Sequence, residues 1–175
     1  MRRPFHLQKF AVSRWGYLAQ ALACAALLGA GYYLEWVEEL TPCPLCIFQR
    51  IAYFGFAVVA LLATLHAPRL KGRQVYSGLM LLCALAGLGV AGRQTWLQHL
   101  PADRIPACGP DLAYMVEMYA PFDVLRRVLR GSGDCAKVDW TFLSLSIAEW
   151  SVVCFILLIA TCLMQLWSTR RTEWR

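Results

Sequence analysis

The stretch WGYLAQALACAALLGAGYYL, residues 15–34, contains no charged side chain. A helix of this length crosses the hydrocarbon core of a bilayer, which is about 30 Å thick. Two more uncharged runs occupy residues 74–92 and 150–169, and a fourth apolar run at 45–65 is interrupted only by Arg50. Transmembrane β-strands would alternate apolar and polar residues, whereas these runs are continuous. Because a helix satisfies its own backbone hydrogen bonds in lipid, the sequence predicts an all-α membrane protein with a bundle of four transmembrane helices.

The composition indicates one integral membrane domain over residues 1–175. Charged residues make up 16% of the chain, against about 25% in soluble domains. We place the spans at about residues 15–34, 45–65, 74–92 and 148–167. The first span is longer than the apolar core of a cleaved signal peptide, which has about 7–15 residues, so we expect it to be retained as a helix.

Basic residues gather in alternate segments between the spans. The chain before the first span carries four basic residues and no acid, and the link at 67–73 carries three basic residues and no acid. The segment at 35–44 carries three acids and no base, and the segment at 93–146 carries six of each. By the positive-inside rule, both termini face the cytoplasm, and the loops at about 35–44 and 93–147 face outward. The net charge of +6 therefore reflects topology in a lipid membrane, and we expect no nucleic-acid partner.

The long outward loop contains the pattern of a short amphipathic helix. Its apolar positions recur at helical spacing, and they are Phe122, Leu125, Val128 and Leu129. Its basic positions fall on the other side, and they are Arg126, Arg127 and Arg130. Pro121 and Gly131 stand where a helix commonly begins and ends. Such a helix either lies on the membrane surface or packs against the rest of the outer region, and the sequence leaves both alternatives open.

Eight cysteines fall into two classes. Four lie within the apolar spans, where a thiol acts as a small apolar side chain, and they are Cys24, Cys83, Cys154 and Cys162. The other four map to the outward side, and they are Cys43, Cys46, Cys108 and Cys135. In a bacterium that side is oxidising, so disulfides persist there. The second class therefore carries the candidate chemistry.

Cys43 and Cys46 form a C-x-x-C motif with Pro44 inside it, where the second span begins. A helix N-terminus favours a thiolate, which is the reactive form of cysteine. Arg50 lies one helical turn after Cys46, on the same helix face. Its guanidinium either stabilises a thiolate and the charge that develops on a reduced quinone, or extends to the outer membrane interface. An all-cysteine zinc site is disfavoured, because such sites usually pair two C-x-x-C motifs and this chain has one.

Cys108 and Cys135 lie 27 positions apart in turn-like segments rich in glycine and proline. By spacing alone, a bridge between them is equally consistent with a structural staple and with an electron shuttle. The nearby C-x-x-C favours the shuttle, because electrons that leave one thiol pair need an acceptor. His99 follows the third span, and by position alone it is a polar or packing residue.

These motifs resemble those of the disulfide bond formation protein B (DsbB) family of bacterial inner membranes. The resemblance covers essentially the whole chain. It includes PCPLCIFQR at 42–50, CGPDLAYM at 108–115 and SGDCA at 132–136, the last followed by Trp140, Phe142 and Leu143.

The resemblance implies a thiol:quinone oxidoreductase that reoxidises a DsbA-type periplasmic thiol oxidase. Cys108 would form the mixed disulfide with that partner, and Cys135 would be its pairing cysteine. Electrons would then pass through Cys43 and Cys46 to ubiquinone or menaquinone. Residues at the quinone would be Cys46, Arg50 and His99. Gln49 stands where some relatives carry an acid, which puts a proton-handling role at that position in doubt.

Two alternatives remain at the level of sequence. A quinone-linked enzyme of the vitamin K epoxide reductase type also uses C-x-x-C and a loop pair of cysteines. In that type the active C-x-x-C is expected after the loop pair, whereas here it precedes the second span. The other alternative is a membrane anchor without redox activity, whose loops are only stapled by disulfides.

Overall fold

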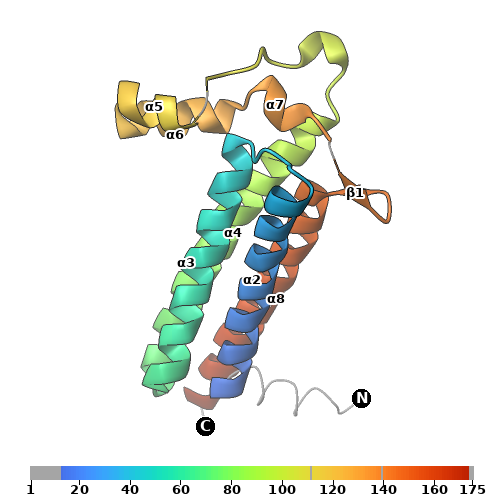
Figure 1. The fold of residues 1–175 in the computed structure, drawn as a ribbon. Helices are drawn as coiled ribbons and strands as arrows, with labels where there is room; N and C mark the ends of the chain where they lie inside the picture. Colours follow the sequence, from blue (N-terminus) through green and yellow to red (C-terminus); the bar gives the residue numbers. More distant parts are fainter. Residues whose placement is uncertain (1–12, 111, 139, 174–175) are drawn as a thin grey trace.

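The computed structural model describes residues 13–110, 112–138 and 140–173. Four long helices form an elongated bundle (Figure 1). They are α2 (Arg14–Val37), α3 (Pro44–His66), α4 (Leu70–Gln98) and α8 (Ile147–Glu173). Each contains an apolar stretch long enough to cross a membrane. The predicted all-α membrane protein with four spanning helices is confirmed. Three of the basic residues on which the predicted cytoplasmic N-terminus rests, Arg2, Arg3 and Lys9, lie outside the described residues.

The helix ends follow from local sequence. Ser13 caps α2 by accepting a hydrogen bond from the backbone N–H of Gly16 at 3.3 Å. Pro44 occupies the first turn of α3, where its missing N–H costs nothing. At the other end of α3, Ala67 is left-handed with φ 45°, and Pro68 follows it. The C-x-x-C motif therefore lies at the start of α3, as the sequence predicts.

The third long helix extends beyond the predicted span at 74–92. Helix α4 runs to Gln98, so Arg93, Gln94 and Gln98 are helical instead of belonging to the loop. The helix continues because the polar groups of these residues find partners at this end of the bundle. The length of the apolar run does not reveal such partners. Arg93 contacts α6, Gln94 contacts the C-x-x-C sulfurs, and Gln98 accepts a hydrogen bond from Ser146 at 2.7 Å.

The bundle interior is apolar along most of its length. Phe56, Met80 and Phe155 are fully buried, and the rings of Tyr53 and Phe155 stack with centroids 4.2 Å apart. Cys24 and Cys162 are also fully buried in this core, in accordance with their reading as small apolar side chains. Large apolar side chains on the outside of the long helices are exposed, as expected of surfaces that face lipid.

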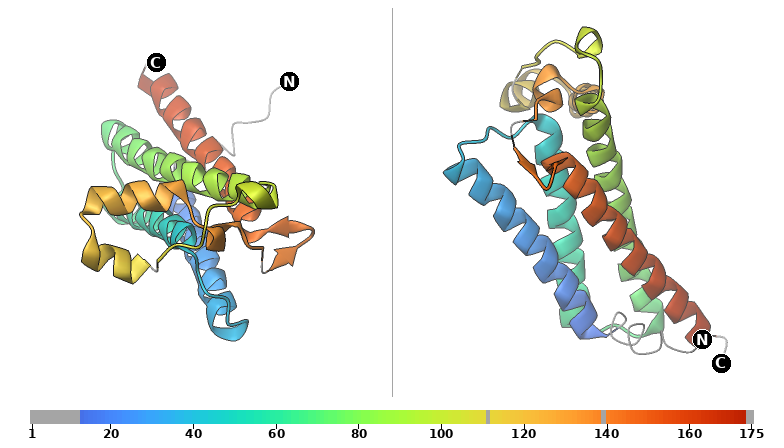
Figure 2. Two further views of the ribbon diagram at one scale, coloured as in Figure 1. Left: turned by 90° about the horizontal axis from the view of Figure 1, so that it is seen from above. Right: turned by 90° about the vertical axis from the view of Figure 1, so that its right-hand side faces the viewer.

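Short elements cover the end of the bundle that carries Cys43 and Cys46, which we call the cysteine end. They are η1 (Ala102–Arg104), α5 (Leu112–Met118), α6 (Pro121–Arg130), α7 (Gly133–Ala136), β1 (Thr141–Phe142) and β2 (Leu145–Ser146). The two strands pair antiparallel. Helices α5 and α6 lie across this end, at a steep angle to the long helices (Figures 1 and 2).

Helix α6 has the bounds that Pro121 and Gly131 predict, but its buried face differs from the predicted apolar face. Val124 and Val128 are buried against Leu45 and Leu97, in a small second core. The other predicted apolar positions, Phe122, Leu125 and Leu129, remain exposed. Packing of Val124 and Val128 thus fixes the helix on the bundle. Contact between its exposed apolar side chains and a membrane surface stays a prediction.

Candidate active site

The C-x-x-C motif forms the N-terminus of α3. Cys43 is the N-cap residue, with extended φ and ψ, and its Sγ accepts a hydrogen bond from the backbone N–H of Cys46 at 3.4 Å. The two sulfurs are 3.0 Å apart, and all eight cysteines of the chain are free. Cys43 is buried and Cys46 is half-buried. A thiolate at this position is stabilised by the positive end of the helix dipole.

Cys135 on α7 lies against this motif. Its side chain is 1% exposed and packs with Cys43 and Leu45 in the small second core. The hydrogen bond from Cys43 is the main cause that lowers the pKa of Cys135 to about 6, and the same contact raises the pKa of Cys43. Cys135 therefore lies against the start of α3, beside Cys43.

The end of α6 positions Cys135. Arg93 on α4 donates to the carbonyl of Leu129 at 3.1 Å and to that of Arg130 at 2.8 Å, so it caps the last turn of α6. Gly131 follows with φ 79° and ψ 160°, a conformation open essentially to glycine alone. A Cβ there would lie 2.3 Å from Cδ1 of the fully buried Leu97. These contacts hold the chain against α4 just before it reaches Cys135.

Cys108 lies on the exposed side of the same segment. Gly133 donates its N–H to the carbonyl of Ala107 at 3.3 Å. A Cβ on Gly133 would lie 2.8 Å from the carbonyl oxygen of Pro106 and 3.3 Å from the Cys108 sulfur. The structure therefore brings Cys108 beside the segment that carries Cys135. Cys108 is exposed, while Cys135 faces inward to Cys43.

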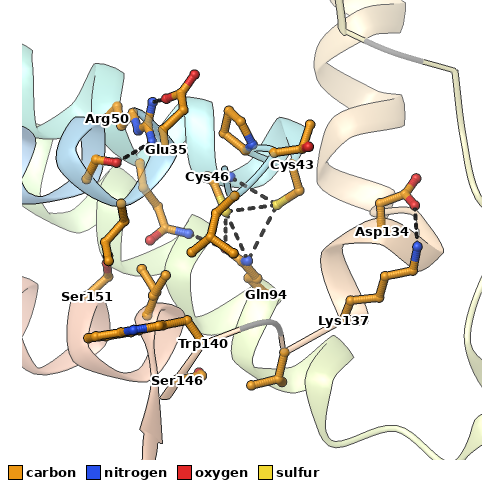
Figure 3. Close-up of a pocket in the computed structure, with 18 of the residues that line it drawn as sticks. Glu35, Cys43, Cys46, Arg50, Gln94, Asp134, Lys137, Trp140, Ser146 and Ser151 are labelled. Carbon is orange, nitrogen blue, oxygen red and sulfur yellow. Dashed lines mark hydrogen bonds and ion pairs between the residues drawn. The ribbon is translucent and has the colours of Figure 1, made fainter. Parts of the chain in front are cut away.

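A pocket opens beside the C-x-x-C motif, between the long helices and the segment after α7 (Figure 3). Its apolar walls come from α2, the α2–α3 link, α3, the segment after α7 and α8. These apolar residues include Leu27, Leu28, Leu34, Leu40, Tyr53, Trp140 and Ile147. Its polar and reactive groups include Glu35, Cys43, Cys46, Gln49, Arg50 and Gln94. An apolar cleft with a few convergent polar groups is typical of a site for a lipid-soluble small molecule.

Arg50 reaches the pocket from α3 and is held from α2. Its guanidinium forms an ion pair with Glu35, donates to the carbonyl of Gly31 at 3.1 Å, and lies 4.7 Å from the ring centre of Tyr32. The sequence predicts a role for Arg50 but misses Glu35 as its partner. The available signal is that Glu35 immediately follows an uncharged span and therefore lies at the membrane boundary.

Gln94 connects the two sulfurs of the motif to α4. Its Nε2 lies 3.2 Å from Sγ of Cys46 and 3.4 Å from Sγ of Cys43 (Figure 3). Its Oε1 accepts a hydrogen bond from Nε2 of Gln49 at 2.6 Å. Both glutamines are only 4% exposed. Sequence reasoning missed Gln94 because it placed this residue in the loop, and the polar pair Gln94 and Gln98 at i, i+4 spacing is the signal that points to one helix face.

His99 lies apart from these groups. It is the C-cap residue of α4, and its Nδ1 lies 2.9 Å from the carbonyl oxygen of Thr95. Its Nε2 is 3.6 Å from Oε1 of Glu149, and its side chain is two-thirds exposed. It is not among the described residues that line the pocket. Contact between His99 and a quinone therefore stays a prediction without support from this arrangement.

The four outward cysteines do not converge as a zinc site would require. Cys108 is exposed, whereas Cys43 and Cys135 are buried in contact with each other. Within the described ranges, no group of three or more histidine, cysteine or acidic side chains is arranged to hold a metal ion. The arrangement favours exchange between sulfurs.

A multi-pass membrane bundle with thiols gathered at one end is the arrangement expected of a membrane oxidoreductase that acts on disulfides. The family model "Disulfide bond formation protein DsbB" matches residues 13–165. The chain therefore belongs to the DsbB family, and the resemblance seen in its motifs is confirmed.

Curated relatives named "Disulfide bond formation protein B" are similar over most of their length. The protein from Marinobacter nauticus is 53% identical over 84% of this chain and 88% of its own. The relative from an Azoarcus species is 48% identical over 95% of this chain and 91% of its own. The Methylococcus capsulatus relative is 45% identical over 91% of this chain and 97% of its own.

Proposed function

We propose that the protein is a thiol:quinone oxidoreductase that reoxidises a DsbA-type periplasmic thiol oxidase. Electrons enter at Cys108 and Cys135 and leave through Cys43 and Cys46. The observation that carries the proposal is the contact between Cys135 and Cys43 at the start of α3, beside an apolar pocket. This contact joins the exposed thiol segment to the C-x-x-C motif without any large movement.

The first exchange takes place at the exposed sulfur. A thiolate of the partner attacks Sγ of Cys108 in the Cys108–Cys135 disulfide, a mixed disulfide forms, and Cys135 leaves as a thiolate. Exposure of Cys108 gives the partner access. The low pKa of Cys135, about 6, makes it a good leaving group, because a thiol of low pKa leaves faster.

The second exchange takes place at the start of α3. The Cys135 thiolate attacks Sγ of Cys43 in the Cys43–Cys46 disulfide, and Cys46 leaves as a thiolate. The partner's second thiolate then releases Cys108, which attacks Cys135 and restores the Cys108–Cys135 disulfide. Each step forms one S–S bond and breaks one. In total, two electrons and two protons pass from the partner's thiols to Cys43 and Cys46.

The pocket suits a quinone, because its walls are apolar and the sulfur of Cys46 lies among its polar groups. A quinone, when bound, supplies the acceptor for two electrons and two protons from the reduced Cys43–Cys46 pair. Leu27, Leu28 and Leu34 would hold its ring or tail, and Arg50 would place positive charge at its oxygen. Ubiquinone and menaquinone are both candidates for this acceptor.

The proposal places the chain in the bacterial inner membrane, with both termini in the cytoplasm and the cysteine end in the periplasm. The alternation of basic and non-basic segments along the chain supports this orientation. Membrane lipid surrounds the exposed apolar faces of the long helices. No nucleic-acid partner is proposed.

The test combines the purified chain, a reduced DsbA-type partner and a soluble quinone without oxygen, and follows quinone absorbance. We expect turnover by the unaltered chain and its loss when serine replaces Cys43, Cys46, Cys108 or Cys135. Cys83→Ser is the matched control, because Cys83 lies in the middle of α4, away from the motif. Turnover that persists in the Cys43→Ser and Cys46→Ser variants would refute the proposal and favour a stapled membrane anchor.

A further inference from the structure

Gln94 is a buried amide whose Nε2 faces the sulfurs of the C-x-x-C motif. Its Nε2 lies within hydrogen-bonding distance of Cys46 and Cys43, at 3.2 and 3.4 Å. The side chain is only 4% exposed, so these contacts are made largely out of reach of water. A buried amide that loses such partners carries a desolvation cost, so these hydrogen bonds contribute to the stability of the fold.

Gln49 fixes which way the amide of Gln94 points. The Nε2 of Gln49 donates to Oε1 of Gln94 at 2.6 Å, so the oxygen of Gln94 is held toward Gln49. An amide has one acceptor end and one donor end, and occupation of the acceptor end turns the N–H groups toward the sulfurs. The thiol form of Cys46 is also accommodated, because its Sγ lies 3.6 Å from Oε1 of Gln94.

The positive charge nearest to the motif on α3 is engaged elsewhere. Arg50 forms an ion pair with Glu35 and donates to the carbonyl of Gly31. Gln94, by contrast, donates directly to the sulfur of Cys46. Hydrogen bonds to a charged acceptor are about twice as strong as those between neutral groups, and an amide strengthens its bond to sulfur when the thiol becomes a thiolate.

We propose that Gln94 is a further catalytic residue, which stabilises the Cys46 thiolate through its Nε2, and that Gln49 is the positioning residue that orients it. The inference deepens the proposed function, on which it rests, because Cys46 is there both the leaving group and the thiol that is reoxidised. A stabilised Cys46 thiolate speeds release from Cys43 and raises the fraction of Cys46 that is ready to donate electrons.

The test measures alkylation of Cys46 by iodoacetamide in the reduced full-length chain in detergent, as a function of pH. Fragment-ion masses assign the modification to Cys46, and no quinone or partner is present. In Gln94→Leu we expect the pH midpoint to rise by about one unit, which is about tenfold less thiolate at a fixed pH below the midpoint. Gln94→Glu keeps the shape but removes the N–H donor, and its carboxylate raises the midpoint at least as far. Gln49→Leu frees the amide to turn and raises the midpoint by a smaller step.

Gln20→Leu is the matched control. Gln20 is also a buried glutamine, but it lies on α2 and contacts Gln165. This variant should leave the midpoint unchanged. An unchanged midpoint in both Gln94 variants overturns the inference, even if the unaltered chain reduces quinone. If the Gln94 variants raise the midpoint but the unaltered chain does not reduce quinone, the role of Gln94 is supported and the proposed function is refuted.

Discussion

The two ends of the bundle both bury glutamine amides, but they use them differently. At the end opposite the cysteines, Ser77 donates to Oε1 of Gln165 at 3.2 Å, and Nε2 of Gln165 donates to Oε1 of Gln20 at 3.2 Å. These partners are neutral and join α2, α4 and α8. At the cysteine end, Gln49 and Gln94 form a similar chain, but it ends on the sulfurs of Cys43 and Cys46.

The difference teaches that the partner, and not the amide, decides what a buried polar network does. A closed network of neutral groups satisfies its members and fixes how the helices pack. A network that ends on an ionisable sulfur also favours one charge state of that sulfur. The first kind predicts effects on stability, and the second predicts effects on reactivity.

The largest effect on turnover is expected when the contact between Cys135 and Cys43 is lost. In Cys135→Ser the attack on Cys43 has no nucleophile, so partner-dependent quinone reduction should fall by at least about 1,000-fold. Cys162→Ser, a matched change at a fully buried cysteine within a span, should retain turnover. Steady-state rates measured with equal amounts of folded protein check this. If the Cys135→Ser chain still reduces quinone, the cysteine end does not differ in reactivity from the opposite end in the way proposed.

The second effect is that of a side chain at Gly131. Gly131→Val forces a β-branched residue into φ 79° and directs its Cβ at Leu97. Such strain costs about 1–3 kcal/mol, so α6 and α7 should shift and weaken the contact of Cys135 with Cys43. We expect a rate about tenfold lower, together with faster amide hydrogen exchange over residues 121–136.

The middle of the transmembrane helices should be unaffected by that change, since a Cβ at Gly131 is directed at Leu97, at the end of α4. Exchange rates in the middle of α3 and α8 are the internal control. Unchanged exchange over residues 121–136 in a folded Gly131→Val chain would mean that this glycine does not position Cys135.

The third effect concerns pH and the reduced form of Cys135. Its pKa of about 6 lies below the usual value for a thiol, so its alkylation rate should reach half of its maximum near pH 6. Because the folded-state pKa is lowered, the thiolate contributes stability that is present above the usual thiol pKa and is lost as pH falls through about 6. Cys43→Ser replaces the main donor with a hydroxyl and should move the alkylation midpoint. A wild-type midpoint near the ordinary thiol value, about 8.5, would contradict the contact.

The smallest effect on activity is expected at the opposite end. Ser77→Ala removes the hydroxyl that links Tyr17 to Gln165 and leaves both with one partner fewer. We expect a loss of about 1–3 kcal/mol in the free energy of unfolding, with the Cys46 alkylation midpoint and turnover unchanged. Thermal unfolding in detergent measures the loss of stability, and the pH profile of Cys46 alkylation measures the midpoint. A shifted midpoint would show that the two ends are coupled.

The sequence by itself determined the parts that depend on neighbouring residues. The run at 15–34 and its three counterparts are long and apolar, so their helical, membrane-spanning nature follows from length and hydropathy alone. The start of α3 at the C-x-x-C motif follows from Pro44, and the bounds of α6 follow from Pro121 and Gly131. Each of these is a local preference, which a single sequence reveals.

Only the tertiary structure decided which groups meet. It brought Cys135 to Cys43, set Gln94 against the sulfurs, paired Glu35 with Arg50, and left His99 outside the pocket. These contacts join residues 15 to 92 positions apart. The contact of Cys135 depends on how α6 and α7 pack across the end of the bundle, and the other two depend on how α3 packs against α2 and α4. Spacing along a chain carries no information about such packing, because it arises from the fit of side chains that are distant in sequence.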